Sequence, residues 1–299
     1  MKKEVLKAEM AFIEKILNQQ IGRVCIESIV RMGGLTNHSY KVVCDNGKAY
    51  AFRIPGEGTE SIINRSDEKI STELACQIGI DAELLYFGSD GTKVMHYISD
   101  AETMTAERLR ADEVIRMVTQ VFQKLHGCGI DTGVPFEIFE MADTYEKFIR
   151  GHKVTMYDDY EDIKNVVLRI KKQIDAQGTI LKVPCHNDSL CENWIYGEGK
   201  MHLIDWEYAG MNDPMWDLAD VSIEAEYTKR EDEALLQYYL GTKPSVEIRQ
   251  RFVANKIYLD YLWTLWGKSR VPFDGDEMEE YAQTRYERLK RNIQEYGEV

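Results

Sequence analysis

The sequence predicts an α+β fold of two lobes, with a small antiparallel β lobe at residues 1–99 and a large, mainly helical lobe at residues 100–299. Two observations predict this division. Before residue 99, short β-rich segments alternate with glycine-containing turns, and one segment has a clear helical pattern. After residue 100, apolar residues recur mostly at helical spacing. The length of 299 residues suits two lobes, since a domain usually has roughly 100–200 residues.

The first lobe is predicted to hold five antiparallel strands and one main helix. Asn46-Gly47 joins two of the strands and is a strong hairpin signal. The helix ends before Gly79, which stands where a helix-terminating glycine is expected. The strands are expected at Val24–Val30, Ser39–Cys44, Ala49–Ile54, Ala82–Phe87 and Lys93–Ile98, and the helix at Ser66–Ile78.

The second lobe is predicted to consist of helices that one hairpin interrupts. Trp194–Tyr196 and Met201–Ile204 alternate like strands, and Gly197–Gly199 turns between them. Helices are expected at about 112–127, 142–151, 159–177, 214–227, 231–240, 245–267 and 276–296. A ligand cleft between the two lobes is where a site is expected.

Two motifs on either side of this hairpin predict a phosphoryl-transfer site. They are His186-x-Asp188-x4-Asn193 and Ile204-Asp205-Trp206-Glu207. An Asp can accept the proton of an attacking hydroxyl, while an Asn oxygen and a carboxylate can hold the Mg2+ that bridges ATP phosphates. We therefore expect Asp188 to act as the base. Asn193 and Asp205 are expected to bind the metal, because the hairpin returns Asp205 to the side of Asn193. The role expected for His186 is to orient the loop.

The turn between the first two predicted strands is a candidate nucleotide site. It contains Gly33 and Gly34, and a glycine turn at this position can lie over phosphates. Thr36 and Asn37 follow and could donate their backbone N–H groups to phosphate oxygens. Taken alone, however, the segment could equally be an ordinary hairpin turn.

An arginine in the third predicted strand is a second candidate. Arg53 is flanked by apolar residues, and a buried cation requires an anionic partner. Glu68 on the following helix can supply that partner, although Asp67 and Glu73 are alternatives. Arg53 would then take the place of the lysine that binds phosphate in kinases, and Glu68 would position it. A solvated arginine on an edge strand is the competing interpretation.

Composition excludes several other classes of function. The formal net charge of −14 makes a nucleic-acid partner or an anionic membrane surface improbable, and it suits a small cationic substrate, although many proteins are acidic only for solubility. The six cysteines show no zinc-binding spacing and are expected to be free thiols. Residues 1–20 are charged and amphipathic, so we expect no secretion signal there, and no apolar run reaches membrane-spanning length. We therefore expect a cytoplasmic protein without membrane insertion.

At these motifs the chain resembles the choline/ethanolamine kinase family, within a larger group that includes the aminoglycoside phosphotransferases. The resemblance covers nearly the whole chain, including Gly33–Asn37, Phe52-Arg53, Asn64-Arg65-x-x-Glu68, the two motifs around the hairpin, Met211–Ala219, Leu262-Trp263-x-x-Trp266 and Tyr281-Ala282-x-x-Arg285-Tyr286. It implies a protein-kinase-like fold, ATP and Mg2+ as cofactors, and phosphorylation of the choline hydroxyl. Ser189 departs from the family, since an apolar residue usually follows the Asp.

The resemblance also implies how the substrate is held. Choline carries a quaternary ammonium group without an N–H, so aromatic faces and a nearby carboxylate are needed to bind it. By resemblance, an aromatic cage is formed by Tyr208, Trp263, Trp266 and Tyr281, and Glu224 supplies negative charge. From their spacing alone, aromatic residues along a late helix would be interpreted as core packing. Resemblance further suggests that Asp217 braces the catalytic loop and that Glu207 binds a second metal ion. Trp194, Trp216 and Tyr227 are expected in packing roles.

Three functions are compatible with these residues. A choline kinase is favoured over an ethanolamine or aminoglycoside kinase, because primary amines prefer carboxylates with hydrogen bonds to aromatic faces. The third alternative is a catalytically silent choline-binding module. The presence of Asp188, Asn193 and Asp205 together argues against it, since binding alone would not require all three.

Overall fold

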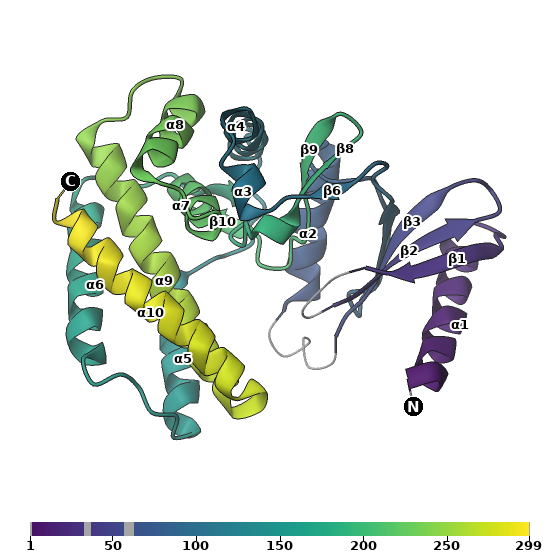
Figure 1. Ribbon diagram of the computed structural model, residues 1–299, viewed down its shortest axis with the longest axis horizontal. Helices are drawn as coiled ribbons and strands as arrows, with labels where there is room; N and C mark the ends of the chain where they lie inside the picture. The colour runs from purple at the N-terminus through teal and green to yellow at the C-terminus, as the bar shows by residue number, and fades with distance from the viewer. Residues whose placement is uncertain (1, 33–36, 57–62, 299) are drawn as a thin grey trace. The chain divides into compact units, whose positions relative to one another are not determined.

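The computed structural model describes residues 2–32, 37–56 and 63–298 of the chain (Figure 1). Its elements divide into two compact units. The first unit consists of residues 1–104 and 192–209, and the second consists of residues 105–191 and 210–299. The α+β class predicted from the sequence is confirmed. The units differ from the two continuous lobes expected at 1–99 and 100–299, because residues 192–209 join the N-terminal part of the chain.

The first unit is built on a five-stranded sheet with the strand order β1-β2-β3-β5-β4. All neighbouring strands in it are antiparallel, as predicted. Residues with β-branched or aromatic side chains alternate along the central strands, so that one face is buried. The strands are β1 (Ile26–Arg31), β2 (His38–Cys44), β3 (Ala49–Ile54), β4 (Leu84–Phe87) and β5 (Lys93–His96).

Among its described residues this unit has two α-helices, whereas the sequence predicted one main helix. The additional helix is α1 (Lys2–Gln20), which lies beside the sheet (Figure 1). Its residues Ile13 and Leu17 are fully buried in a core cluster that also contains Tyr40. The predicted helix is α2 (Arg65–Gln77). It begins after Asn64, whose side chain accepts hydrogen bonds from the backbone N–H groups of the first turn.

The hairpin that follows the catalytic loop packs into the first unit. Its strands are β8 (Trp194–Gly197) and β9 (Lys200–Leu203), and the short strand β6 (Glu102–Thr103) pairs with β8. Leu203 also donates its backbone N–H to the carbonyl oxygen of Ile80 at 3.0 Å. These bonds explain why residues 192–209 belong to a unit that is otherwise N-terminal.

The second unit is mainly helical, as predicted. Its longest helix, α9, has 29 residues and continues past the expected end near residue 267 to Asp274. Pro272 lies inside its last turn, where the missing N–H removes only one bond near the helix end. The α-helices of this unit, α9 included, are α3 (Ala106–Leu109), α4 (Asp112–His126), α5 (Ile138–Gly151), α6 (Tyr160–Ala176), α7 (Pro214–Glu224), α8 (Lys229–Leu240), α9 (Val246–Asp274) and α10 (Asp276–Tyr296).

Inside the second unit, α9 and α10 run alongside each other, and α5 and α7 also pack on α9 (Figure 1). The antiparallel strands β7 (Val183–Cys185) and β10 (Gly210–Asn212) lie before and after the segment that the first unit takes up. The core includes Trp216, which is fully buried, as expected for a packing residue. Within the described ranges, no helix is both long and apolar enough to span a bilayer.

Candidate active site

The loop that carries Asp188 begins directly after β7 and is held by a carboxylate of α7. Asp217 accepts the backbone N–H of His186 on Oδ2 and that of Asn187 on Oδ1, each at 2.8 Å. Asn187 has a left-handed φ of 66°, which a non-glycine residue adopts rarely. Asp188 in turn donates its N–H to His186 Nδ1 at 3.3 Å. The predicted orienting contacts of Asp217 and His186 are therefore present.

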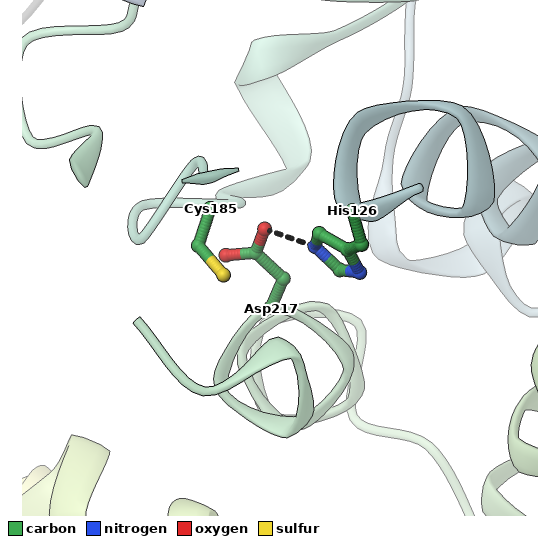
Figure 2. Close-up of side chains that lie close together, drawn as sticks. All are labelled: His126, Cys185 and Asp217. Carbon is green, nitrogen blue, oxygen red and sulfur yellow. Dashed lines mark hydrogen bonds and ion pairs between the residues drawn. The ribbon is translucent and has the colours of Figure 1, made fainter. Parts of the chain in front are cut away.

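Asp217 also contacts a buried histidine, as Figure 2 shows. His126, at the end of α4, lies with Nε2 3.0 Å from Asp217 Oδ2, and its Nδ1 lies 2.9 Å from the Tyr239 hydroxyl. Cys185 lies close enough to these two side chains to suggest a metal site. Burial and the nearby carboxylates, however, raise the pKa of the Cys185 thiol well above its usual value. A metal ion would need the deprotonated thiolate as its ligand. We therefore interpret this cluster as a brace of the loop and not as a metal site.

A second carboxylate of α7 holds the other side of the loop. Asp220, which is buried, accepts the backbone N–H of Ser189. Burial raises the pKa of Asp220 well above its usual value, and the charges of Glu224 and Asp188 raise it further. Ser189 itself is completely buried, so its polar side chain does not point into solvent. Asp220 was not predicted from the sequence, although its spacing of three residues from Asp217 places both on one face of α7.

Three of the predicted cage residues lie together in the second unit. The rings of Trp263 and Trp266 are 6.1 Å apart at 90°, and those of Trp266 and Tyr281 are 5.6 Å apart at 74°. Gly267 permits this approach of α9 and α10, because an added Cβ would lie only 2.8 Å from a ring carbon of Tyr281. Tyr208 belongs to the first unit, so its part in a cage stays a prediction.

Glu224, which the resemblance places near the cage to supply negative charge, has a cationic partner. Its Oε1 lies 2.6 Å from Nη1 of Arg285 and 3.9 Å from Nη2 of Arg288. The guanidinium of Arg285 also lies over the ring of Tyr281, 5.0 Å from its centroid. Sequence reasoning assigned no role to Arg285, because a lone arginine on a helix does not reveal a carboxylate 61 residues earlier in the chain.

In the first unit, the predicted pair of Arg53 and Glu68 is confirmed. Nη2 of Arg53 lies 2.5 Å from Oε1 of Glu68, and both side chains are buried. The alternative partner Glu73 is instead exposed and lies 3.7 Å from Lys69. Arg53 also extends to the metal-binding motif, since its Nη1 lies 3.1 Å from Oδ1 of Asp205.

Two further cations share the carboxylate of Glu68, and sequence reasoning assigned a role to neither. Nη1 of Arg65 lies 2.7 Å from Glu68 Oε2 and 3.5 Å from Glu207 Oε2. Nζ of Lys93, on the neighbouring strand β5, lies 3.5 Å from Glu68 Oε1. Burial and the charge of Asp205 raise the pKa of Glu207, and Arg53 opposes the rise.

The predicted nucleotide turn is only partly described. Gly34 and Thr36 lie outside the described residues. Asn37 lies inside them, is buried, and donates from its side-chain Nδ2 to Oε2 of Glu207 at 3.2 Å. The turn therefore ends beside the motif that carries Asp205.

The chemistry of these side chains fits a hard divalent cation. Oxygen atoms of Glu68, Asp205 and Glu207 lie within 4.8 Å of one another, and carboxylate oxygens are the ligands that Mg2+ prefers. The hairpin also brings Asn193 to this segment, because Ile204 donates its N–H to the carbonyl oxygen of Asn193 at 3.0 Å. Asp205 has a left-handed φ of 68°, a backbone strain of the kind found at functional sites.

Known proteins resemble this chain in sequence. The sequence profile of the choline/ethanolamine kinase family matches residues 28–290. The protein LicA of Haemophilus influenzae is 26% identical over 273 residues, which cover 88% of this chain and 79% of LicA. A probable ethanolamine kinase of Arabidopsis thaliana is 24% identical over 295 residues, covering 87% of this chain and 77% of that protein.

Solved structures agree with this likeness. A choline/ethanolamine kinase family protein from Mesorhizobium loti has a TM-score of 0.83 at 33% identity, with 98% of this chain and 95% of that chain covered. Choline kinase LicA from Streptococcus pneumoniae has a TM-score of 0.81 at 30% identity, with 97% and 100% covered. The protein-kinase-like fold implied by the resemblance is thereby confirmed. The chain belongs to the choline/ethanolamine kinase family and is an ATP-dependent kinase.

Proposed function

We propose that this protein is a choline kinase, which transfers the γ-phosphoryl group of ATP to the hydroxyl of choline and forms phosphocholine. The observation that carries the choice of substrate is the group of Trp263, Trp266 and Tyr281 in the unit that also holds Asp188. Aromatic faces attract a quaternary ammonium group, which has no N–H to donate. The named choline kinase of Streptococcus pneumoniae among the structural relatives supports the same choice.

Asp188 is the base in this proposal. It accepts the proton of the choline hydroxyl and aligns the oxygen for attack on the γ-phosphorus. The loop around it is suited to this role, because Asp217 and Asp220 hold the backbone N–H groups before and after Asp188. A base on a braced loop is positioned before the substrate arrives, which lowers the entropic part of the barrier.

The residues of the first unit bind the nucleotide and the metal. Arg53, positioned by Glu68, contacts the phosphates, and the turn with Gly34, Thr36 and Asn37 covers them. Asn193 and Asp205 would hold Mg2+, and Glu207 would contribute to a second ion. When bound, Mg2+ neutralises charge on the transferring phosphoryl group. Arg53 also compensates the negative charge of Asp205.

The experiment that tests the proposal is a coupled assay of ADP release. Purified protein is given ATP and Mg2+ with choline, ethanolamine or kanamycin as the acceptor. We expect the highest kcat/KM with choline, a lower value with ethanolamine and no stimulation by kanamycin. A preference for ethanolamine would make the protein an ethanolamine kinase. Binding of choline without any ADP release would support the silent binding module.

A further inference from the structure

A buried group of charges lies beside Tyr281 in the second unit. We name Glu224, Asp260, Arg285 and Arg288 the α10 charge cluster. Arg285, only 6% exposed, lies 2.6 Å from Glu224 and 3.7 Å from Asp260. Arg288 mainly holds Asp260, with Nη2 2.8 Å from Oδ1. The contact of Arg285 with Glu224 is an ion pair whose angles fall outside those of a hydrogen bond.

The α10 charge cluster is tied to the catalytic loop through α7. Asp220, which accepts the N–H of Ser189, stands one helical turn before Glu224 on α7. Cys191, at the end of the loop, donates its thiol to the backbone oxygen of Glu224 at 3.3 Å. The cluster therefore touches both the loop of Asp188 and, through Arg285, the ring of Tyr281.

We propose that Arg285 is a specificity-determining residue, which favours a fully methylated ammonium head group over a primary one by keeping the Glu224 carboxylate in an ion pair. The inference rests on the proposed function, because it concerns the same substrate site. Arg285 acts through Glu224 and is a positioning residue rather than one that touches the reacting atoms.

The physical reason lies in what each head group gains from a carboxylate. A primary ammonium gains a charge-assisted hydrogen bond from an available carboxylate, and such a bond is stronger than a neutral one. A quaternary ammonium cannot form it and gains only attraction at a distance, so its binding depends more on aromatic faces. Because Arg285 compensates the charge of Glu224, it removes a hydrogen-bond acceptor that only the primary amine could use. The ring of Trp266, which lies beside Tyr281, remains for the methylated head group.

The test compares Arg285→Gln with the wild type in the ratio of kcat/KM for ethanolamine to kcat/KM for choline. We expect this ratio to rise by about tenfold or more, because Glu224 becomes available to an N–H donor. Arg288→Gln is the matched control, since it removes a guanidinium from the same cluster and leaves the contact of Arg285 with Glu224 intact. Its ratio should stay within about threefold of the wild type. An unchanged ratio in folded Arg285→Gln, or an equal rise in the control, would overturn the inference.

Methylammonium and tetramethylammonium isolate the head group from the hydroxyl. Both ions are measured as competitive inhibitors against choline. The ratio of the Ki of methylammonium to the Ki of tetramethylammonium should fall, relative to the wild type, only in the Arg285 variant. If Arg285→Gln does not fold, Arg285→Lys keeps the charge but lacks the planar fork. Its ratio should rise by a few-fold, and no rise would equally contradict the inference. A wild type inactive on both amino alcohols would refute the proposed function itself, whereas an active wild type with unresponsive variants would refute only the role of Arg285.

Discussion

Asp188 is the residue on which the proposed chemistry depends most. Asp188→Asn removes the proton acceptor while keeping the size of the side chain. We expect kcat to fall by about 10²–10⁴-fold, the usual contribution of a general base. ADP release measures the loss, and thermal unfolding together with ATP binding shows whether the fold and the nucleotide site survive. Turnover close to that of the wild type would show that another group is the base.

The two proposed metal ligands differ in charge, and this difference gives a second prediction. Asp205→Ala should raise the Mg2+ concentration needed for half-maximal activity more than Asn193→Ala does, because a carboxylate attracts the cation and an amide does not. The measurement is a Mg2+ titration of kcat/KM for each variant. A titration unchanged in Asp205→Ala would place the metal elsewhere.

At the residue scale, contacts between residues on consecutive elements of the chain could be predicted from the sequence. Arg53 and Glu68 could be predicted as a pair, because a cation in an apolar strand needs an anion on the next element. The contact of Arg65 with Glu207 could not be predicted in this way. It joins residues 142 positions apart, and no local pattern reports which distant carboxylate a side chain meets. For the same reason, although Glu224 was predicted to supply negative charge, its partner Arg285 was not predicted.

Helix α7 braces the catalytic loop, and the brace can be tested through Asp217. Asp217→Asn leaves one acceptor oxygen for two loop N–H groups and His126, so one buried donor loses its partner. We expect a loss of about 1–3 kcal/mol in the free energy of unfolding and a lower kcat. The matched control is Asp112→Asn, since Asp112 also accepts hydrogen bonds but its side chain is 62% exposed. Urea unfolding should detect a loss only in the Asp217 variant, and equal losses would contradict the brace.

The pair of helices α9 and α10 presents the aromatic rings, and the choice between a cage and core packing can be measured. Trp266→Leu and Tyr281→Leu should each raise the KM for choline far more than the KM for ATP. Each lost cation–π contact corresponds to about 0.5–2 kcal/mol once desolvated. Phe252→Leu serves as the control, because Phe252 is buried in the core on the same helix α9 and should lower only stability. Equal losses for choline and ATP with a lower melting temperature would identify Trp266 as a packing residue.

At the element scale, the types of element were more predictable than their ends. Strands bounded by glycine turns and helices with an apolar stripe carry their own pattern, so the hairpin of β8 and β9 was predicted. The N-terminal helix α1 was not counted among the elements of the first lobe, because it buries only a narrow set such as Ile13 and Leu17 among charged residues. Helix α9 was predicted too short, since packing against α10 outweighs the local effect of Pro272.

The stability of the whole molecule should depend on one buried acid of the first unit. Burial raises the pKa of Asp81 to about 6, against the opposing effects of Lys93 and the bond from Trp206. An acid with a raised pKa binds its proton more tightly in the folded protein. Its stabilising contribution is therefore complete below about pH 4 and is lost as the pH rises through about 6.

Asp81→Asn makes this effect measurable. Between pH 4 and pH 7, the free energy of unfolding of the wild type should fall by about 3 kcal/mol relative to the variant, which corresponds to a shift of about two pKa units. Urea unfolding at several pH values gives the comparison. Asp90→Asn, at a surface position of the same unit, controls for the loss of any carboxylate. A constant difference between Asp81→Asn and the wild type across this range would contradict the prediction.

The path of the chain through the two units was the least predictable feature of the whole molecule. Composition and periodicity change once near residue 100, so they predict one boundary. The hydrogen bonds that draw residues 192–209 into the first unit, such as that between Leu203 and Ile80, join residues 90 or more positions apart. Such pairing depends on tertiary contacts, which a single sequence does not display.

This path has a consequence for synthesis on the ribosome. When the first 104 residues have emerged, β6 still lacks its partner β8, and Asp81 lacks the indole N–H of Trp206 that it later accepts at 3.0 Å. A further 105 residues must be translated before the missing segment is complete at Ala209, which takes several seconds or longer at roughly 5–20 residues per second. The N-terminal part therefore lacks these hydrogen bonds while residues 105–191 of the other unit are translated. A gene cut after codon 104 would encode a fragment that cannot complete its own fold.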